Sequence, residues 1–269
     1  MSLVTSPRTP PLWVRLIAAV MGALAIAFAF GPGIATSVWL LFSEPGSSAS
    51  SDPVGSLITG LWFLSAGLVF AYGATRALAG GDATREWLRG RPDPQPGSGL
   101  LSAGGALLAL LLGYLLFVAL GPELRTQSAD RPLWFELTWR VLVAGLGEEL
   151  LVLALPVVLL RHSAPRWLAR HGALVIVLLA VLRMSYHVHY GVWALSLVPW
   201  AAAAAWLYLR FGRVWPLILQ HAGYDIVLAL RDAGTISQAT QNTLFVASTV
   251  LLVGAGCWVA RSRTPPAAS

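Results

Sequence analysis

An all-α bundle of about eight transmembrane helices is the fold class that this sequence predicts. Of its 269 residues, 57% are hydrophobic and only 11% are charged, and the mean hydropathy is +0.70. Soluble domains contain about 25% charged residues, so this composition is typical of a polytopic membrane protein. The chain also divides into apolar runs long enough to cross the ~30 Å hydrocarbon core of a bilayer.

Eight apolar runs account for most of the chain. The first, from about 12 to 42, is interrupted by Gly31-Pro32-Gly33. It far exceeds the roughly 7 to 15 apolar residues of a signal peptide, so one long, kinked helix is expected. The other runs lie near 54–78, 99–120, 133–160, 172–190, 192–209, 214–231 and 243–260.

The distribution of arginine predicts the orientation in the membrane. The net charge of +6 comes from arginine alone, because the sequence contains no lysine. With the N-terminus inside, thirteen of the eighteen arginines fall in cytoplasmic segments, as the positive-inside rule requires. This alternation predicts an even number of spans with both termini in the cytoplasm. The alanine-rich, lysine-free composition suggests a bacterial protein of the cytoplasmic (inner) membrane, and the scattered arginines give no reason to expect nucleic acid binding.

The composition predicts four regions. Residues 1–79 contain a polar tail and two spans, and residues 80–98 are rich in Pro, Gly and charge, as in a mobile cytoplasmic linker. Residues 99–261 contain six spans, and residues 262–269 form a C-terminal tail. The predicted chemistry lies entirely in the six-span region.

Two adjacent carboxylates, Glu148 and Glu149, lie in the middle of an otherwise apolar run. A charged carboxylate at bilayer depth costs roughly 2.5 kcal/mol or more, so such a pair persists only if other groups compensate or use it. Two close carboxylates in a low dielectric do not both ionise readily, which suits one of them to act as a general base on water. Gly145 and Gly147 precede the pair and permit close approach of another helix, and Pro156 follows it.

Two later runs supply the candidate partners. Arg183 and His187 are four residues apart, as are His221 and Asp225. Residues spaced i, i+4 share one helix face, so each pair can point into the interior of the bundle. Three helices are therefore predicted to bring a Glu pair, an Arg/His pair and a His/Asp pair to one polar cavity.

The order of these groups resembles the CPBP family of intramembrane proteases, which includes the CAAX prenyl endopeptidases and the bacteriocin-processing or self-immunity (Abi) proteins. The three family motifs are E-E-x-x-x-R, F-x-x-x-H and H-x-x-x-N, the last with Asp as an alternative to Asn. The corresponding stretches here, within about 130–231, are Glu148-Glu149-Leu-Leu-Val-Leu153, Arg183-Met-Ser-Tyr-His187 and His221-Ala-Gly-Tyr-Asp225. Leu153 replaces the family Arg, and Arg183 replaces the family Phe.

The resemblance implies hydrolysis of a peptide bond in or next to the membrane, in a protein or peptide substrate. Glu148 would activate water with Glu149 beside it, His187 and His221 would position the water or stabilise the oxyanion, and Asp225 would support His221. Two mechanisms remain open. One uses a catalytic Zn²⁺ held by His187, His221 and Glu148, and the other is a glutamate-based mechanism without a metal.

Two other functions remain open from the sequence. A proton-coupled transporter could use buried Glu, His and Asp as a relay, although no internal repeat supports it. A non-catalytic membrane scaffold or immunity protein could retain the fold, and the Leu at position 153 is its best support.

The two departures from the motifs predict a specific contact. Without an Arg at position 153, Glu149 needs another cation, and Arg183 is the arginine well inside a predicted span. We therefore expect a hydrogen-bonded Glu149–Arg183 pair that holds His187 at the cavity. In the alternative arrangement, Arg183 extends to the nearer membrane interface and pairs with nothing.

Overall fold

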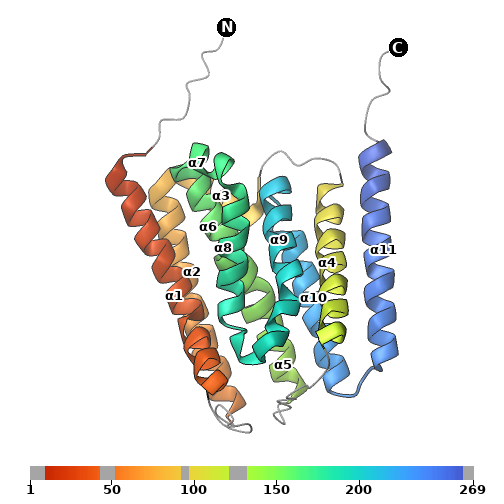
Figure 1. The fold of residues 1–269 in the computed structure, drawn as a ribbon. Coiled ribbons are helices and arrows are strands. Elements are labelled where there is room, and N and C mark those ends of the chain that lie inside the picture. The colour runs from red at the N-terminus through yellow and green to blue at the C-terminus, as the bar shows by residue number, and fades with distance from the viewer. Residues whose placement is uncertain (1–9, 43–51, 92–96, 121–131, 263–269) are drawn as a thin grey trace, which may run out of the picture.

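The computed structural model describes residues 10–42, 52–91, 97–120 and 132–262. Every regular element within these ranges is a helix, which confirms the predicted all-α class (Figure 1). The elements are α1 (Leu12–Phe42), α2 (Pro53–Ala79), α3 (Gly81–Arg89), α4 (Ser98–Leu120), α5 (Leu133–Trp139), the π-helix η1 (Arg140–Ala154), α6 (Leu155–Ser163), α7 (Pro165–Arg170), α8 (Gly172–Ser185), the 3-10 helix η2 (Val188–Leu197), α9 (Val198–Phe211), α10 (Trp215–Asp232) and α11 (Gln238–Ser262).

Six helices in the described part of the chain are long and apolar enough to cross a membrane, fewer than the eight predicted. The two predicted spans that fall short are 172–190 and 214–231. The first ends as an α-helix at Ser185, after 14 residues, and continues as η2, in which Gly191 has a φ of 62°. The second is α10, whose 18 residues include Gln220, His221 and Asp225. Both shortfalls arise in the segments that carry the candidate site, where polar groups and irregular backbone replace a uniformly apolar helix.

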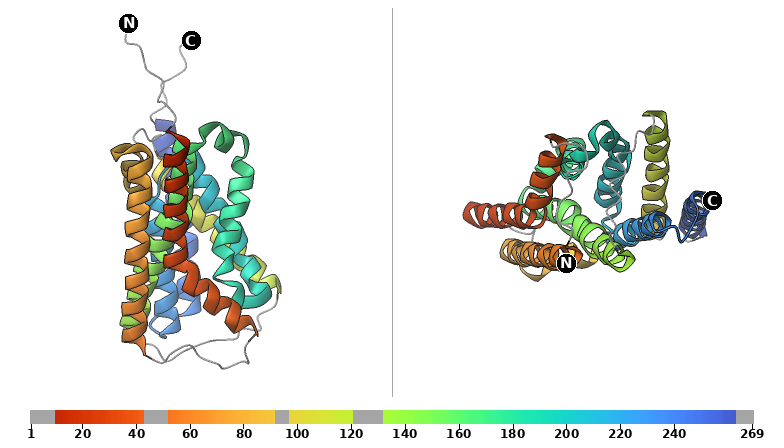
Figure 2. Two further views of the ribbon diagram at one scale, coloured as in Figure 1. Left: turned by 90° about the vertical axis from the view of Figure 1, so that its left-hand side faces the viewer. Right: turned by 90° about the horizontal axis from the view of Figure 1, so that it is seen from below.

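The long helix formed by α5, η1 and α6 runs through the middle of the bundle (Figures 1 and 2). Helices α1 and α2 pack together on one flank, and α4 and α11 pack together on the other. Helix α1 begins and α11 ends at the same end of the bundle (Figure 1). Helix α10 packs against η1, so two of the three predicted site segments are neighbours.

The region predicted to be a mobile linker contains a docked helix, α3, which corrects that expectation for residues 81–89. The sequence GDATREWLR is amphipathic, and Ala83, Thr84 and Trp87 are buried. The Trp87 indole Nε1–H donates to the carbonyl oxygen of Leu150 at 2.8 Å. Helix α3 is therefore attached directly to η1, one residue beyond the Glu pair.

A charged cluster fixes the other side of α3. Glu86 pairs with Arg161, and its Oε2 lies 2.9 Å from His162 Nε2, both at the end of α6. Burial alone would raise the pKa of Glu86, but the hydrogen bond with His162 and the charge of Arg161 together lower it. Glu86 is therefore ionised near neutral pH and anchors α3 to the central helix.

Candidate active site

The Glu pair lies in η1, a π-helix of 15 residues. The amide of Leu155, which follows it, donates to the carbonyl of Leu150, five residues earlier, and α-helical geometry resumes around Pro156. π-Helical turns are rare and are frequently found at functional sites. Glu148 and Glu149 are both buried, with residue exposures of 5% and 0%.

The two glycines before the pair lie where neighbouring helices approach closely, as predicted. A Cβ on Gly145 would lie 2.7 Å from the Cβ of Ala222 in α10, and one on Gly147 would lie 2.9 Å from Leu64 Cδ1 in α2. Because Ala222 follows His221 directly, the absence of a side chain at Gly145 sets the distance between the two site helices.

Replacing Gly145 with Leu is expected to lower the free energy of unfolding by about 2 kcal/mol, because overpacking of a close helix contact typically costs 1–3 kcal/mol. Chemical unfolding in detergent measures the change. Gly254→Leu is the matched control, because a Cβ at Gly254 in α11 would meet nothing within 4 Å. Equal stability of the two variants would contradict the close contact.

The predicted pair between Glu149 and Arg183 is present. Arg183 Nη2 donates to Glu149 Oε1 at 2.6 Å, and Arg183 Nε lies 3.3 Å from Glu148 Oε2. Arg183, at the end of α8, is only 2% exposed and pairs with carboxylates, in contrast to the alternative in which it pairs with nothing. The geometry confirms the expected contact and places both carboxylates around one guanidinium.

His221 connects the pair to α10. Its Nδ1 lies 3.0 Å from Glu149 Oε1, and its Nε2 lies 3.5 Å from Asp225 Oδ2. The second distance exceeds that of an ordinary N–H···O hydrogen bond, so Asp225 is more loosely attached than Glu149. The interior therefore contains an Arg183–Glu149–His221 chain of contacts, with Asp225 at its far end.

Tyr186 is a site residue that the sequence reasoning did not single out. Its hydroxyl donates to Glu148 Oε2 at 2.8 Å, and the side chain is buried. Its position next to His187 was the available signal, but a tyrosine costs little in an apolar segment and so does not by itself indicate a site. The described contacts of Glu148 all go to Oε2, so its Oε1 is free of protein partners there.

Trp200, in α9, is a second residue that the sequence did not indicate. Its ring lies under the Arg183 guanidinium at 4.3 Å and meets the His221 ring edge-on at 4.5 Å. Its indole also points to Gln220 Oε1, at 3.4 Å. This cation–π contact adds to the stabilisation that the two carboxylates give the Arg183 charge.

His187 joins the cluster through ring contacts. It lies against Tyr186, with centroids 4.7 Å apart, and stacks on Tyr190 at 5.6 Å and 15° between planes. Its Nδ1 is buried and has no hydrogen-bond partner in the described part of the chain. Contacts with aromatic rings, and not a hydrogen bond at Nδ1, therefore hold the His187 ring in place.

The donors do not fit the zinc site that the sequence left open. Among the residues that the structure describes, no group of three or more His, Cys, Asp or Glu side chains is placed to hold a metal ion. Both nitrogens of His221 face carboxylates of the protein, and the described contacts of His187 are with other rings.

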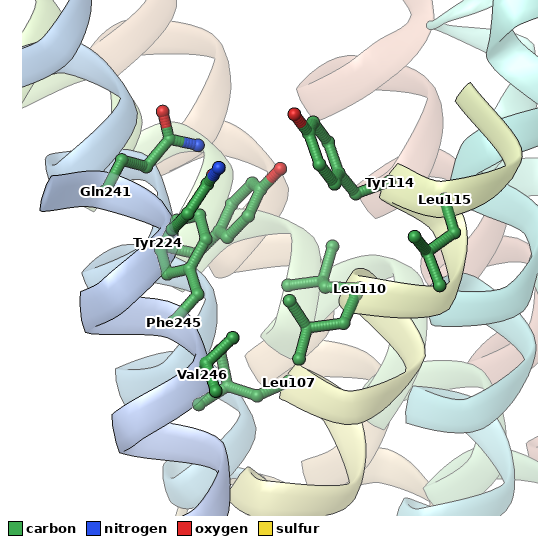
Figure 3. A pocket seen from close by; sticks show the side chains of 10 residues that line it. Leu107, Leu110, Tyr114, Leu115, Tyr224, Gln241, Phe245 and Val246 are labelled. Atoms are coloured by element: carbon green, nitrogen blue, oxygen red, sulfur yellow. The ribbon is translucent and has the colours of Figure 1, made fainter. Parts of the chain in front are cut away.

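A separate cavity of about 300 Å³ lies between α4, α10 and α11 (Figure 3). Its walls are mostly apolar, and none of the six predicted site residues lines it. Tyr224 lines this cavity and stacks on Phe245, whereas its neighbour Asp225 faces His221. Helix α10 therefore presents one face to the cavity and another to the polar cluster. The polar cavity expected around the cluster stays a prediction.

The segment that carries the cluster matches a known family. Residues 130–227 match the family model described as type II CAAX prenyl endopeptidase, Rce1-like. The chain contains an Rce1-like domain. It begins just before α5 and ends in α10, so it includes Glu148, Glu149, Arg183, His187, His221 and Asp225.

The Rce1-like domain agrees with the resemblance to the CPBP proteases seen in the motifs and indicates an intramembrane endopeptidase in general. No curated protein and no solved structure gave a significant match to the chain. Helices α1, α2 and α3 lie outside the matched segment, although all three pack against elements within it.

Proposed function

We propose that the protein hydrolyses a peptide bond in or next to the membrane and that Glu148 is the general base that activates water. The observation that supports this most strongly is the asymmetry of the Glu pair. Glu149 Oε1 is engaged by both Arg183 and His221, whereas Glu148 keeps one oxygen free of protein contacts among the described residues. A general base needs an oxygen that can accept a proton from water.

In this proposal, Glu148 Oε1 takes a proton from a water molecule while the water oxygen bonds to the scissile carbonyl carbon. The resulting oxyanion is stabilised by nearby donors, and the proton then passes from Glu148 to the leaving amine as the C–N bond breaks. Tyr186 donates to Glu148 Oε2, and the charged Arg183 Nε lies 3.3 Å from the same oxygen, so the carboxylate is held on that side and its other oxygen is left for the reaction.

The remaining residues receive more specific roles than the sequence could assign. Glu149 and Arg183 form the electrostatic frame, and Trp200 covers the guanidinium. His187 is the better candidate for a water or oxyanion contact, because His221 is already engaged by Glu149 and lies near Asp225. Asp225 then serves chiefly to orient His221.

The arrangement weakens the grounds for a non-catalytic scaffold. That alternative rested on Leu153, where the family has Arg, and Arg183 reaches the same Glu149 from another helix. We propose a membrane-embedded or membrane-adjacent protein or peptide as substrate, surrounded by lipid. The bacterial inner membrane with both termini cytoplasmic is the proposed location, and the common end of α1 and α11 fits it (Figure 1).

The test is a comparison of new N-termini in membranes from cells that contain the wild-type protein or Glu148→Ala. The proposal predicts a set of membrane-protein cleavages that appears only with the wild type. Identical sets of N-termini at equal protein levels would contradict proteolysis, and solute flux by the reconstituted protein without cleavage would favour a transporter instead.

A further inference from the structure

A hydrogen-bonded serine connects α1, which lies outside the matched domain, to the segment that carries His187. Ser37 is 2% exposed and faces η2. The backbone N–H of His189 donates to Ser37 Oγ at 3.0 Å, and Ser37 Oγ lies 2.7 Å from His189 Nδ1. Helix α1 contains Pro32, and its second half bends toward η2 (Figure 2).

These two contacts leave the Ser37 hydroxyl proton available to Nδ1 of the neutral His189 ring. Ser37 Oγ already accepts the backbone N–H of His189, so its own proton is free to donate. With the Ser37 hydroxyl donating to Nδ1, the neutral imidazole of His189 carries its proton on Nε2. In this arrangement, Ser37 selects one tautomer and one orientation of the ring.

The oriented ring supports His187 through its neighbours. His189 lies 4.1 Å from the Tyr190 ring, and Tyr190 in turn stacks on His187. On the other side, Phe30 of α1 stacks on Tyr186 at 5.1 Å, and Tyr186 contacts His187. Because the buried Nδ1 of His187 has no hydrogen-bond partner in the described chain, these rings are what fixes its orientation.

We propose that α1 is part of the catalytic apparatus and that Ser37 is a positioning residue, which acts on His187 through His189 and Tyr190. The Ser37–His189 contact resembles that of a nucleophile with its base, but Ser37 is buried and a substrate cannot reach it. Its hydroxyl also already serves the His189 backbone. The effect of Ser37 on cleavage rests on the proposed function, whereas the His189 tautomer is a property of the protein without substrate.

The first experiment measures the tautomer directly. The chain contains five histidines, so a ¹⁵N-histidine-labelled sample in lipid nanodiscs gives a simple NMR spectrum, and His189→Gln identifies the His189 signals. We expect the Nε2–H form of His189 in the wild type, a mixture of tautomers in Ser37→Ala and return to one form in Ser37→Thr. Thr36→Ala is the matched control, because it removes an exposed hydroxyl from the same helical turn. A proton on Nδ1 in the wild type, or identical spectra for wild type and Ser37→Ala, would overturn the inference.

The second experiment measures turnover of a cleavage that depends on Glu148. Ser37→Ala is expected to lower kcat about five- to ten-fold, the effect of one hydrogen bond, with KM within about two-fold, while Ser37→Thr and Thr36→Ala keep wild-type kcat. Unchanged kcat in Ser37→Ala beside an inactive Glu148→Gln would reject the positioning role and leave the proposed function intact. Absence of cleavage by the wild type would reject the proposed function, and the tautomer would still be decided by NMR.

Discussion

Replacing Glu148 with Gln is expected to reduce the rate of peptide cleavage by about 10³-fold, within the range that a general base contributes. The amide preserves the shape of the side chain and can still accept the Tyr186 hydroxyl, but it cannot take a proton from water. The measurement is single-turnover cleavage by purified protein in lipid nanodiscs, with thermal unfolding recorded for each variant.

Glu136→Gln provides the control, because it removes a carboxylate from the same transmembrane segment outside the polar cluster. It should cleave at close to the wild-type rate. Turnover by Glu148→Gln within ten-fold of wild type would remove Glu148 from the role of general base.

Replacing Arg183 with Leu is expected to destabilise the protein by about 3 kcal/mol or more, because the change leaves buried carboxylates without their cation. Arg183 contacts both Glu149 and Glu148 and is almost fully buried. Adding Leu153→Arg should restore part of the loss, because Glu149 Oε2 is buried without a partner in the described structure and lies one turn away. Chemical unfolding in detergent provides the free energies.

Arg85→Leu is the matched control for this experiment, since Arg85 forms an exposed pair with Asp82. Exposed pairs contribute about 0–1 kcal/mol, so little change is expected. If Arg183→Leu were as stable and active as the wild type, Arg183 would not be the cation that compensates for Leu153.

The parts of the site that sequence reasoning could reach are those with a high energetic cost in a membrane. Glu149 and Arg183 each required a partner of opposite charge at bilayer depth, so their contact followed from the sequence before any coordinates. The all-α class followed in the same way, from apolar runs that only helices can satisfy in lipid. The number of spans was predicted less well. The backbone is irregular in η2, and α10 contains polar residues, so these two segments are less clearly spans than uniform apolar helices.

The parts of the site that the sequence did not predict depend on contacts between residues far apart in the chain. Each of these residues has a low free-energy cost in a membrane, so none requires a partner. Tyr186, Trp200 and Ser37 are ordinary constituents of apolar sequence, and only the packing reveals which group each one meets. Helix α3 was hidden for a related reason. Its sequence is polar enough to form a linker, but the Trp87 indole binds Leu150 of η1 and Glu86 binds Arg161 and His162 of α6, which docks the helix.

Cleavage by metal-stripped protein tests most directly whether a carboxylate held by Arg183 activates water. The purified wild type is treated with a chelator, its zinc content is measured, and cleavage is followed in metal-free buffer. Because His187, His221 and Glu148 do not form a three-ligand group among the described residues, we expect the wild-type rate at far less than one zinc per protein. Loss of cleavage on chelation with recovery on adding Zn²⁺, at unchanged thermal stability, would contradict this role of the carboxylate.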